Sequence, residues 1–241
     1  MHKGIYIALS AATLKQTQMD LISQNLANVN TSGYKRDKIA FSEFLLSQMN
    51  NREEQPDGRT MSFFGAVTTD MAPGSIVNTG NQLDLAIDGE GFFSLENGKY
   101  SKRGDFRLDD DGYIVNHKGI KVLGQGGPIQ ITDTGRISIS SEGEVSVNNA
   151  GTNNLIDTLR IVEFADKSVL RKSGEDMFES PQEGVESRAV IQQGYIEKSN
   201  VDAVREMVQM ITALREFETY QKTIQIFDES TGRVLSDIPR I

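Results

Sequence analysis

The chain has 241 residues, with no cysteine, no tryptophan and two histidines, and its 34 acidic and 25 basic residues give a net charge of −9. This composition excludes disulfide frameworks and thiol catalysis, leaves little imidazole for metal or acid–base chemistry, and disfavours nucleic acid as a partner because phosphates need a basic face. The mean hydropathy of −0.38 and the lack of an apolar run near about 18 residues predict no membrane span.

Residues 3–29 have the pattern of one long amphipathic helix. Glycine and proline are absent between Ile5 and Ser32, and Gly33 supplies a helix stop. Polar residues interrupt the apolar positions, so this is not the core of a signal peptide, and we expect the protein to stay in the cytoplasm or to leave the cell without a cleaved signal. Apolar residues at heptad-like spacing predict a seam formed by Ile5, Leu9, Ala12, Met19 and Leu26.

Residues 34–70 follow neither a helical nor a strand period. The polar stretch from Asn50 to Thr60 predicts an extended arm or a flexible loop that joins the helix to the next domain. The basic residues Lys35, Arg36 and Lys38 could meet an acidic neighbour or form a solvated cluster.

From residue 83 the apolar period changes to two, which is typical of strands. Turns containing glycine punctuate the chain from Gly112 to Gly143 every seven or eight residues. Short, evenly spaced strands of this kind predict an antiparallel β domain, a sandwich or a small barrel, over 71–197. Leu159–Phe164 adds a further strand, and His117, beside a turn, is expected to be exposed at a hairpin tip.

The C-terminal part again has a helical period. Ser199 is the predicted N-cap, with Asp202 reaching back from the first turn, and Gly232 is the predicted end of the helix. An apolar stripe along this helix contains Val204, Val208, Ile211, Leu214, Phe217 and Ile224. Together with the apolar seam of the first helix, these residues are the predicted assembly interface.

The whole chain is therefore predicted to be α+β, with long N- and C-terminal helices that pair as a coiled coil and a central antiparallel all-β domain. Residues 1–33 and 198–241 form the discontinuous helical domain, 34–70 the arm and 71–197 the β domain. Isolated helices are marginal in water, so these two need partner surface. Packing between copies, with the termini becoming ordered on assembly, is one solution; an intramolecular helical hairpin is the other.

Candidate catalytic patterns are weak. The run from Asp109 to Gly112 resembles the start of a calcium loop but lacks the alternating ligands and the terminal glutamate, so a solvated turn is favoured. The glycine-rich stretches open no helix that could receive phosphate. No cofactor, metal or catalytic residue is predicted. Paired carboxylates such as Asp84 and Asp88 leave a hydrolase as an open alternative, and a β binding module on a helical stalk is another. With 7% aromatic residues and no tryptophan, sugar stacking is poorly provided for.

The segments that border the helices carry a resemblance to a known family. Residues 25–35 read NLANVNTSGYK and closely resemble the N-terminal motif of bacterial flagellar rod and hook proteins, of the form N-L-A-N-x-x-T-x-G-[FY]-[KR]. Residues 83–93, 100–106 and 193–201 resemble further stretches of the same family. The motif positions matched here are Asn25, Leu26, Ala27, Asn28, Thr31, Gly33, Tyr34, Lys35, Ser199, Asn200 and Val201.

The resemblance implies a non-enzymatic subunit of the flagellar basal-body rod. In that family the terminal helices pair into a coiled-coil tube around an export channel, with the β domain outside. The implied partners are other copies of the chain, neighbouring rod proteins and the flagellar type III export apparatus, and the implied location is the periplasmic rod, reached without a cleaved signal peptide. The short chain and the tail around 215–232 favour the proximal-rod F-type member over the distal-rod member.

Overall fold

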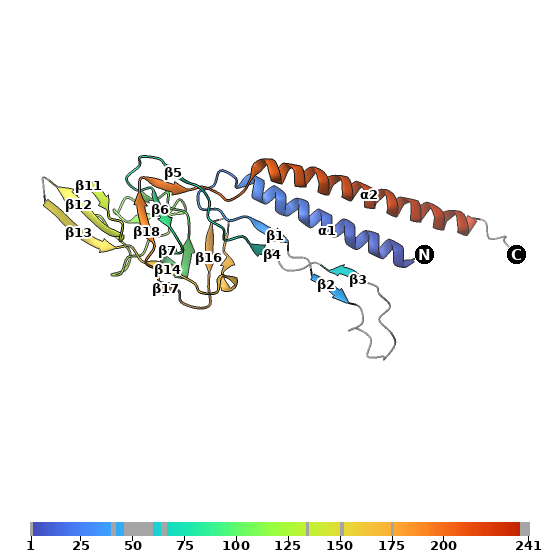
Figure 1. Cartoon of the computed structure of the whole chain (residues 1–241), viewed down its shortest axis with the longest axis horizontal. Coiled ribbons are helices and arrows are strands. Elements are labelled where there is room, and N and C mark those ends of the chain that lie inside the picture. Colours follow the sequence, from blue (N-terminus) through green and yellow to red (C-terminus); the bar gives the residue numbers. More distant parts are fainter. Residues whose placement is uncertain are drawn as a thin grey trace. The chain divides into compact units, whose positions relative to one another are not determined.

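The computed structural model describes residues 2–39, 42–45, 60–63, 67–133, 135–149, 152–174 and 176–236 (Figure 1). The chain divides into two compact units. The helical unit consists of 1–27, 37–70 and 202–241, and the β unit consists of 28–36 and 71–201. The arm expected over 34–70 therefore falls mostly within the helical unit, and residues 28–33, which were expected to belong with the helices, fall within the β unit.

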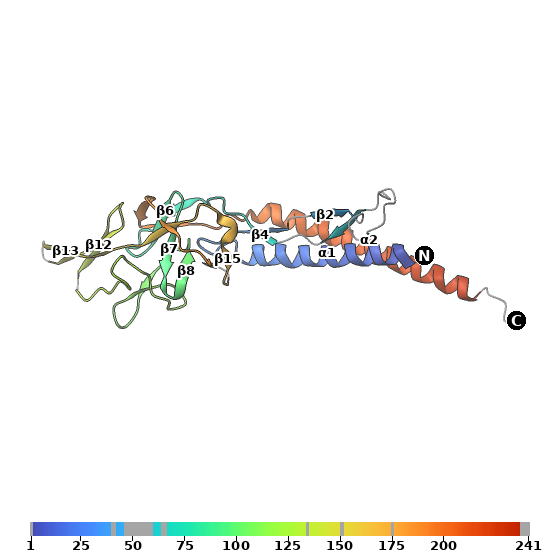
Figure 2. The ribbon, with the colours of Figure 1, turned by 90° about the horizontal axis from the view of Figure 1, so that it is seen from below.

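The two expected helices are present. Helix α1 spans His2–Ala27 and helix α2 spans Ala203–Ser236, and they run antiparallel and side by side in both views of the ribbon (Figures 1 and 2). Among the described residues, no helix is long and apolar enough to cross a membrane.

The ends of α2 differ from the prediction. Its N-cap is Asp202, whose Oδ1 accepts hydrogen bonds from the backbone N–H groups of Val204 (3.0 Å) and Arg205 (3.1 Å). The predicted cap, Ser199, instead accepts a bond from Val201 N–H outside the helix. The helix also continues through Gly232 to Ser236, because a glycine in a helix costs only about 1 kcal/mol and stops it only where the backbone turns left-handed.

Removing the cap gives a testable result. Because Asp202 satisfies two backbone donors that have no partner within the helix, we expect Asp202→Ala to lower the free energy of unfolding of the helical unit by about 1 kcal/mol. Urea unfolding followed by circular dichroism at 222 nm measures this. Asp202→Asn keeps a capping oxygen and should stay near the wild-type value; an equal loss in both variants would show that the cap is not the cause.

The seam between the helices has a regular pattern of burial. Lys15 Nζ lies 2.6 Å from Glu216 Oε2, and the ring of Phe227 packs over Gly4. Among the α2 side chains that are at least half-buried, one row recurs at alternating steps of four and three: Glu206, Met210, Ala213, Phe217, Tyr220, Ile224 and Phe227. Ala203, Glu216 and Thr223 flank this row. On α1 a row with the same spacing contains Ile5, Ala8, Ala12, Lys15, Met19 and Ile22, with further covered residues such as Leu21 and Asn25 beside it.

The helical unit also contains short strands from the segment that was expected to be an arm or loop. Strand β1 (Asp37–Ile39) pairs with β4 (Val67–Thr69), and β2 (Ser42–Leu45) pairs with β3 (Thr60–Phe63), both antiparallel. Most of the polar stretch that suggested a flexible loop lies in 46–59, outside the described residues.

The β unit is built from short antiparallel strands, as predicted. Its larger sheet has the order β15-β16-β8-β7-β14-β17, a second has β11-β12-β13, and three pairs are β18-β6, β19-β5 and β10-β9. The bounds are β5 Ile76–Asn78, β6 Leu85–Asp88, β7 Phe92–Leu95, β8 Lys99–Ser101, β9 Arg107–Leu108, β10 Ile114–Val115, β11 Arg136–Ile139, β12 Glu144–Asn149, β13 Thr152–Thr158, β14 Ile161–Glu163, β15 Arg171–Lys172, β16 Met177–Glu179, β17 Val185–Glu186, β18 Val190–Gln193 and β19 Tyr195–Glu197. Two short 3-10 turns, η2 Glu96–Gly98 and η3 Lys167–Val169, complete the unit.

Alternating apolar residues form the core of the β unit. On β11 and β12, Ile137, Ile139, Val145 and Val147 are buried, as their period of two predicts. They join Phe93 in a large cluster, and a second cluster gathers around Phe92, Val162, Phe164 and Phe178. Each buried side chain of this size contributes about 1.5–3 kcal/mol, so these clusters hold the unit together.

Candidate functional site

The first motif residue fixes the chain beyond α1. Asn25 is buried; its Nδ2 donates to the carbonyl of Asp37 and its Oδ1 accepts from the N–H of Asp37, both at 2.9 Å. The carboxylate of Asp37 accepts a bond from Thr69 Oγ1 at 2.7 Å. One amide side chain thus pairs with the backbone as a strand would, and holds the edge of β1 at the end of the helix.

The next motif residues make a tight turn in the β unit. Thr31 donates its hydroxyl to Asn28 Oδ1 at 3.1 Å, and Gly33 follows with a φ of +66°. A Cβ at Gly33 would clash with the backbone of Lys102 and Arg103, so a side chain here is excluded by both conformation and space. The N–H of Gly33 donates to the carbonyl of Glu197 at 2.7 Å.

A buried ion pair lies at the centre of the motif. Lys35 Nζ is 2.6 Å from Glu197 Oε1, and the two side chains are 1% and 3% exposed. Lys35 also donates to the carbonyl of Ala72 at 2.9 Å, and Glu197 accepts from the N–H of Gly74 at 2.8 Å. Of the two environments expected for Lys35, the structure shows the acidic neighbour. Two buried charges are tolerated because each also has backbone partners.

A second lysine approaches the same carboxylate. Lys102 Nζ lies 3.9 Å from Glu197 Oε2 and donates to the carbonyl of Gly89 at 2.9 Å. Burial lowers the pKa of Lys102 from 10.5 to about 8, against the opposing effect of Glu197. The ammonium of Lys102 therefore loses its proton far more readily than an exposed lysine does.

The C-terminal motif residues meet the N-terminal ones here. Asn200 Oδ1 accepts from the N–H of Arg36 at 2.8 Å, and Asn200 Nδ2 donates to the carbonyl of Ala72 at 3.0 Å. Tyr34 is fully buried, and Lys172 Nζ lies 4.2 Å from the centre of its ring. One network of hydrogen bonds and ion pairs thus joins residues 34–36 to residues 197–200, which lie more than 160 positions away in the chain. We call it the motif network.

The eleven residues of the predicted assembly interface divide into two groups by their exposure in the single chain. Ala12 is buried, and Ile5, Met19, Leu26, Phe217 and Ile224 are half-buried. The other five are exposed, from 46% at Leu214 to 71% at Val204, and therefore do not lie in the seam between α1 and α2: Leu9, Val204, Val208, Ile211 and Leu214. The residues predicted on α2 lie on two faces of the helix, one covered and one exposed, because a step of three or four fits either face.

The exposed residues of α2 form an apolar face of their own. With Met207, also exposed, they recur at steps of three and four along the first half of the helix: Val204, Met207, Val208, Ile211 and Leu214. On α1, Tyr6, Ile7 and Leu9 are exposed as well. Soluble proteins rarely leave such a continuous stripe in water unless it binds something. We call the five α2 residues the α2 apolar face.

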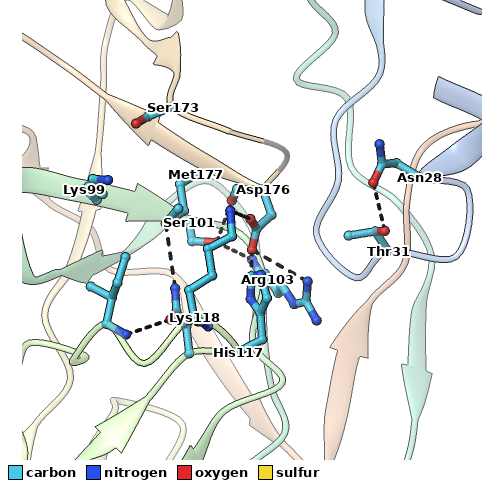
Figure 3. Close-up of polar contacts among 12 residues, drawn as sticks. Asn28, Thr31, Lys99, Ser101, Arg103, His117, Lys118, Ser173, Asp176 and Met177 are labelled. Atoms are coloured by element: carbon cyan, nitrogen blue, oxygen red, sulfur yellow. Dashed lines mark hydrogen bonds and ion pairs between the residues drawn. The ribbon is translucent and has the colours of Figure 1, made fainter. Parts of the chain in front are cut away.

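A separate charged cluster lies in the β unit. The carboxylate of Asp176, 1% exposed, is 3.4 Å from His117 Nδ1, 3.8 Å from Arg103 Nη1 and 3.8 Å from Lys118 Nζ, and all three basic side chains point toward it (Figure 3). Neither carboxylate oxygen accepts a hydrogen bond from a described residue. His117 was expected to be exposed at a hairpin tip and is instead largely covered, because its ring turns inward toward this buried charge.

This cluster makes stability depend on pH. The groups that face His117 are Asp176, Asp105, Arg103 and Lys118, and burial, outweighing Asp176, lowers its pKa from the ordinary 6.5. Below pH 6.5 the unfolded chain binds the proton more readily than the folded one, so the free energy of unfolding falls as the pH falls from 6.5. We expect His117→Gln to flatten this fall in urea unfolding measured between pH 7.5 and 5; an unchanged slope would assign the fall to other groups.

Several residues of these networks were not foreseen. Glu197, Lys102 and Lys172 carry no sequence period, and their partners lie far away in the chain. Asp176 follows no recognisable spacing either. A buried charge is visible in sequence only as an isolated polar residue between apolar strands, and an exposed polar residue has the same appearance.

Comparison with known proteins agrees with this geometry. Three family descriptions match the chain: "Flagella basal body rod protein" over 5–35, "Flagellar hook protein FlgE/F/G D1 domain" over 86–147, and "Flagellar basal body rod FlgEFG protein C-terminal" over 192–237. The first contains Tyr34 and Lys35 and the last contains 197–200, so the buried pair of Lys35 and Glu197 joins two matched segments.

Whole-length relatives extend the match. The flagellar basal-body rod protein FlgG of Agrobacterium fabrum is 32% identical over 98% of this chain and 99% of the relative, and FlgG of Bacillus subtilis is 33% identical over 95% and 96%. The rod protein FlgF of Rhizobium meliloti is 29% identical over 99% and 98%.

The paired helices, the apolar α2 face and the motif network are parts of a structural protein, not of an enzyme. The chain belongs to the flagellar basal-body rod protein family, whose members are structural subunits of the flagellum basal body.

Proposed function

We propose that this chain builds the rod by packing its terminal helices against those of other copies and of neighbouring rod proteins. The observation that carries the proposal is the α2 apolar face, which remains exposed although α1 already covers the opposite side of α2. The pairing of α1 with α2 matches the intramolecular hairpin considered from the sequence. Assembly then adds a second contact to α2, on its exposed face. The hairpin within one chain and the packing between copies are therefore compatible.

The geometry suits an open filament. A contact between two different faces, repeated by a screw operation, extends without closing. Each apolar side chain of this size that becomes fully buried stabilises the contact by roughly 1.5–3 kcal/mol. The α2 apolar face has five such side chains, and the contact recurs in every copy. We propose that terminal helices packed in this way form a coiled-coil tube around a central channel, as the family suggests.

We also propose a location and an export route. The family suggests a rod in the periplasm, which this chain would reach through the flagellar type III apparatus.

Within the family we propose the proximal-rod F-type role. The alignment with FlgF of Rhizobium meliloti spans 246 positions, close to the 241 residues of this chain, whereas that with FlgG of Agrobacterium fabrum spans 263. The alignments with FlgF of Salmonella typhimurium and FlgG of Bacillus subtilis both span 256 positions, so the support from length comes from the first pair, and the resemblance of the tail around 215–232 adds to it. The distal-rod role is the second candidate, because the FlgG relatives reach slightly higher identity.

Deletion of the gene tests the two roles. A proximal subunit supports everything built after it, so its loss should leave basal bodies that contain neither this chain nor the FlgG-type protein of the same organism. Loss of a distal subunit should leave the FlgF-type protein in place. Mass spectrometry of purified basal bodies distinguishes the outcomes, with the complemented strain as the control, and a deletion strain that still assembles a complete rod and hook would contradict both roles.

A further inference from the structure

The β unit contains a polar hollow that the motif network does not use. Its volume is about 740 Å³. Two loops and the sheet β11-β12-β13 contribute its walls, and its lining residues are Asn78, Gly80, Asn81, Gln82, Arg136, Ile137, Ser138, Asn148, Asn153, Gln193 and Gly194.

The floor of the hollow is held rigidly. Gln193 Nε2 donates to the carbonyls of Gln82 (2.8 Å) and Ile137 (3.1 Å), and its Oε1 accepts from the N–H of Ile139 at 3.2 Å. Gly80 and Gly194 adopt φ values of +75° and +84°, so side chains there are disfavoured and the floor stays clear. A binding surface built on fixed groups loses little entropy when it is occupied.

The chemistry of the lining indicates the kind of ligand. Asparagine and glutamine side chains both donate and accept hydrogen bonds, which matches a peptide backbone. Among the described residues of the lining, Arg136 is the one that carries a charge, although acidic residues outnumber basic ones in the chain. An arginine with no acidic residue among these lining residues favours a carboxylate. The described lining also offers no aromatic ring on which a sugar could stack.

The chain itself contains a segment of that chemistry. The turn between β9 and β10 reads Asp109-Asp110-Asp111-Gly112 and is closed by a bond from Gly112 N–H to the carbonyl of Asp109. Asp109 Oδ1 accepts bonds from the backbone of the turn, at Asp111 and Tyr113, while Asp110 and Asp111 are exposed. The turn is narrow, preformed and negatively charged, and it shares no residue with the hollow.

We propose that in the rod the hollow of one copy receives the acidic turn 109–112 of a neighbouring copy, with Arg136 binding its carboxylates. This rests on the proposed assembly of copies. The contact joins two different surfaces, so it can repeat along a screw axis as the helical contact does, and it would fix the β units of adjacent copies to one another.

Charge reversal tests the pairing in the whole chain, expressed in a strain that lacks the gene. We expect Arg136→Glu alone, and Asp110→Lys with Asp111→Lys, each to lower the number of assembled rods about tenfold. Combining all three substitutions should restore most of it. Arg171→Glu, and Glu142→Lys with Glu144→Lys, are exposed controls with the same charge changes and should stay near wild type. Normal assembly with Arg136→Glu, or no restoration in the combination, overturns the proposal.

Cross-linking tests the contact directly, because the chain has no cysteine. Asn153→Cys and Asp110→Cys are made in separate copies and expressed together. We expect a disulfide-linked dimer in purified basal bodies from the mixture, which can only join two copies, and none from either variant alone. Absence of the mixed dimer, in basal bodies that contain both variants, overturns the proposal.

The helical contact of the proposed function and the contact at the hollow can be tested independently of each other. If a charge on the α2 apolar face leaves assembly intact, the helical contact is wrong, whatever the hollow does. If that charge blocks assembly while Arg136→Glu has no effect, the helical contact stands and the hollow is not an interface.

Discussion

Replacing Leu214 with aspartate is expected to abolish swimming without unfolding the protein. In the single chain Leu214 is 46% exposed, so the new carboxylate stays in water and should change the free energy of unfolding by no more than about 0.5 kcal/mol. In the rod the same carboxylate would be buried in an apolar contact, which costs several kcal/mol unless a partner is present. The contact repeats in every copy, so the effect on assembly is large.

Swimming of a complemented deletion strain measures this effect, and circular dichroism of the purified variant checks its fold. Gln209→Asp adds the same charge to a neighbouring exposed position of α2, outside the apolar face, and should support normal swimming. If Leu214→Asp swims as well as Gln209→Asp, the α2 apolar face is not an assembly surface.

The second large effect is expected at the centre of the motif network. Lys35→Met removes the cation nearest to Glu197 and leaves its buried carboxylate with only the more distant Lys102, 3.9 Å away, as a counter-charge. Breaking a buried pair in this way destabilises the folded state by about 3–5 kcal/mol, and we expect urea unfolding to move to a much lower midpoint. Lys35→Met combined with Glu197→Leu removes both members of the pair and should recover part of the loss, because the buried carboxylate is gone and Lys102 still donates to the carbonyl of Gly89.

The chain offers a matched control for this experiment. Lys38 Nζ also lies 2.6 Å from a carboxylate, that of Asp70, but the two side chains are 49% and 20% exposed. Exposed pairs of this kind contribute about 1 kcal/mol or less, so Lys38→Met should have a small effect. A loss from Lys35→Met no greater than that from Lys38→Met would contradict the central place of the buried pair.

The sequence predicts the elements of this fold better than their contacts. Both long helices follow from a helical period without internal breakers, and the strands of the β unit follow from alternation punctuated by glycine. These signals are local, so one sequence is enough to show them. The predicted start of α2 was less accurate. Ser199 and Asp202 both have side chains that can cap a helix, and only the backbone geometry decides between them.

Contacts between distant segments could not be predicted in the same way. Lys35 and Glu197 are separated by 162 positions, and no period connects them; the family motif marked Lys35 but gave no partner. The α2 helix shows the same limit, because its apolar residues fit two faces and only the position of α1 shows that Phe217 lies inward and Leu214 outward. The exposed face became visible only once the inward face was occupied.

A cryo-electron microscopy map of isolated basal bodies, at a resolution that shows side chains, would place α2 in the assembled rod. We expect a helix of a neighbouring subunit to cover Val204, Val208, Ile211 and Leu214, while Phe217 and Ile224 remain against α1 of the same chain. A map in which the α2 apolar face lies against water or the central channel, with another surface joining the copies, would contradict this expectation.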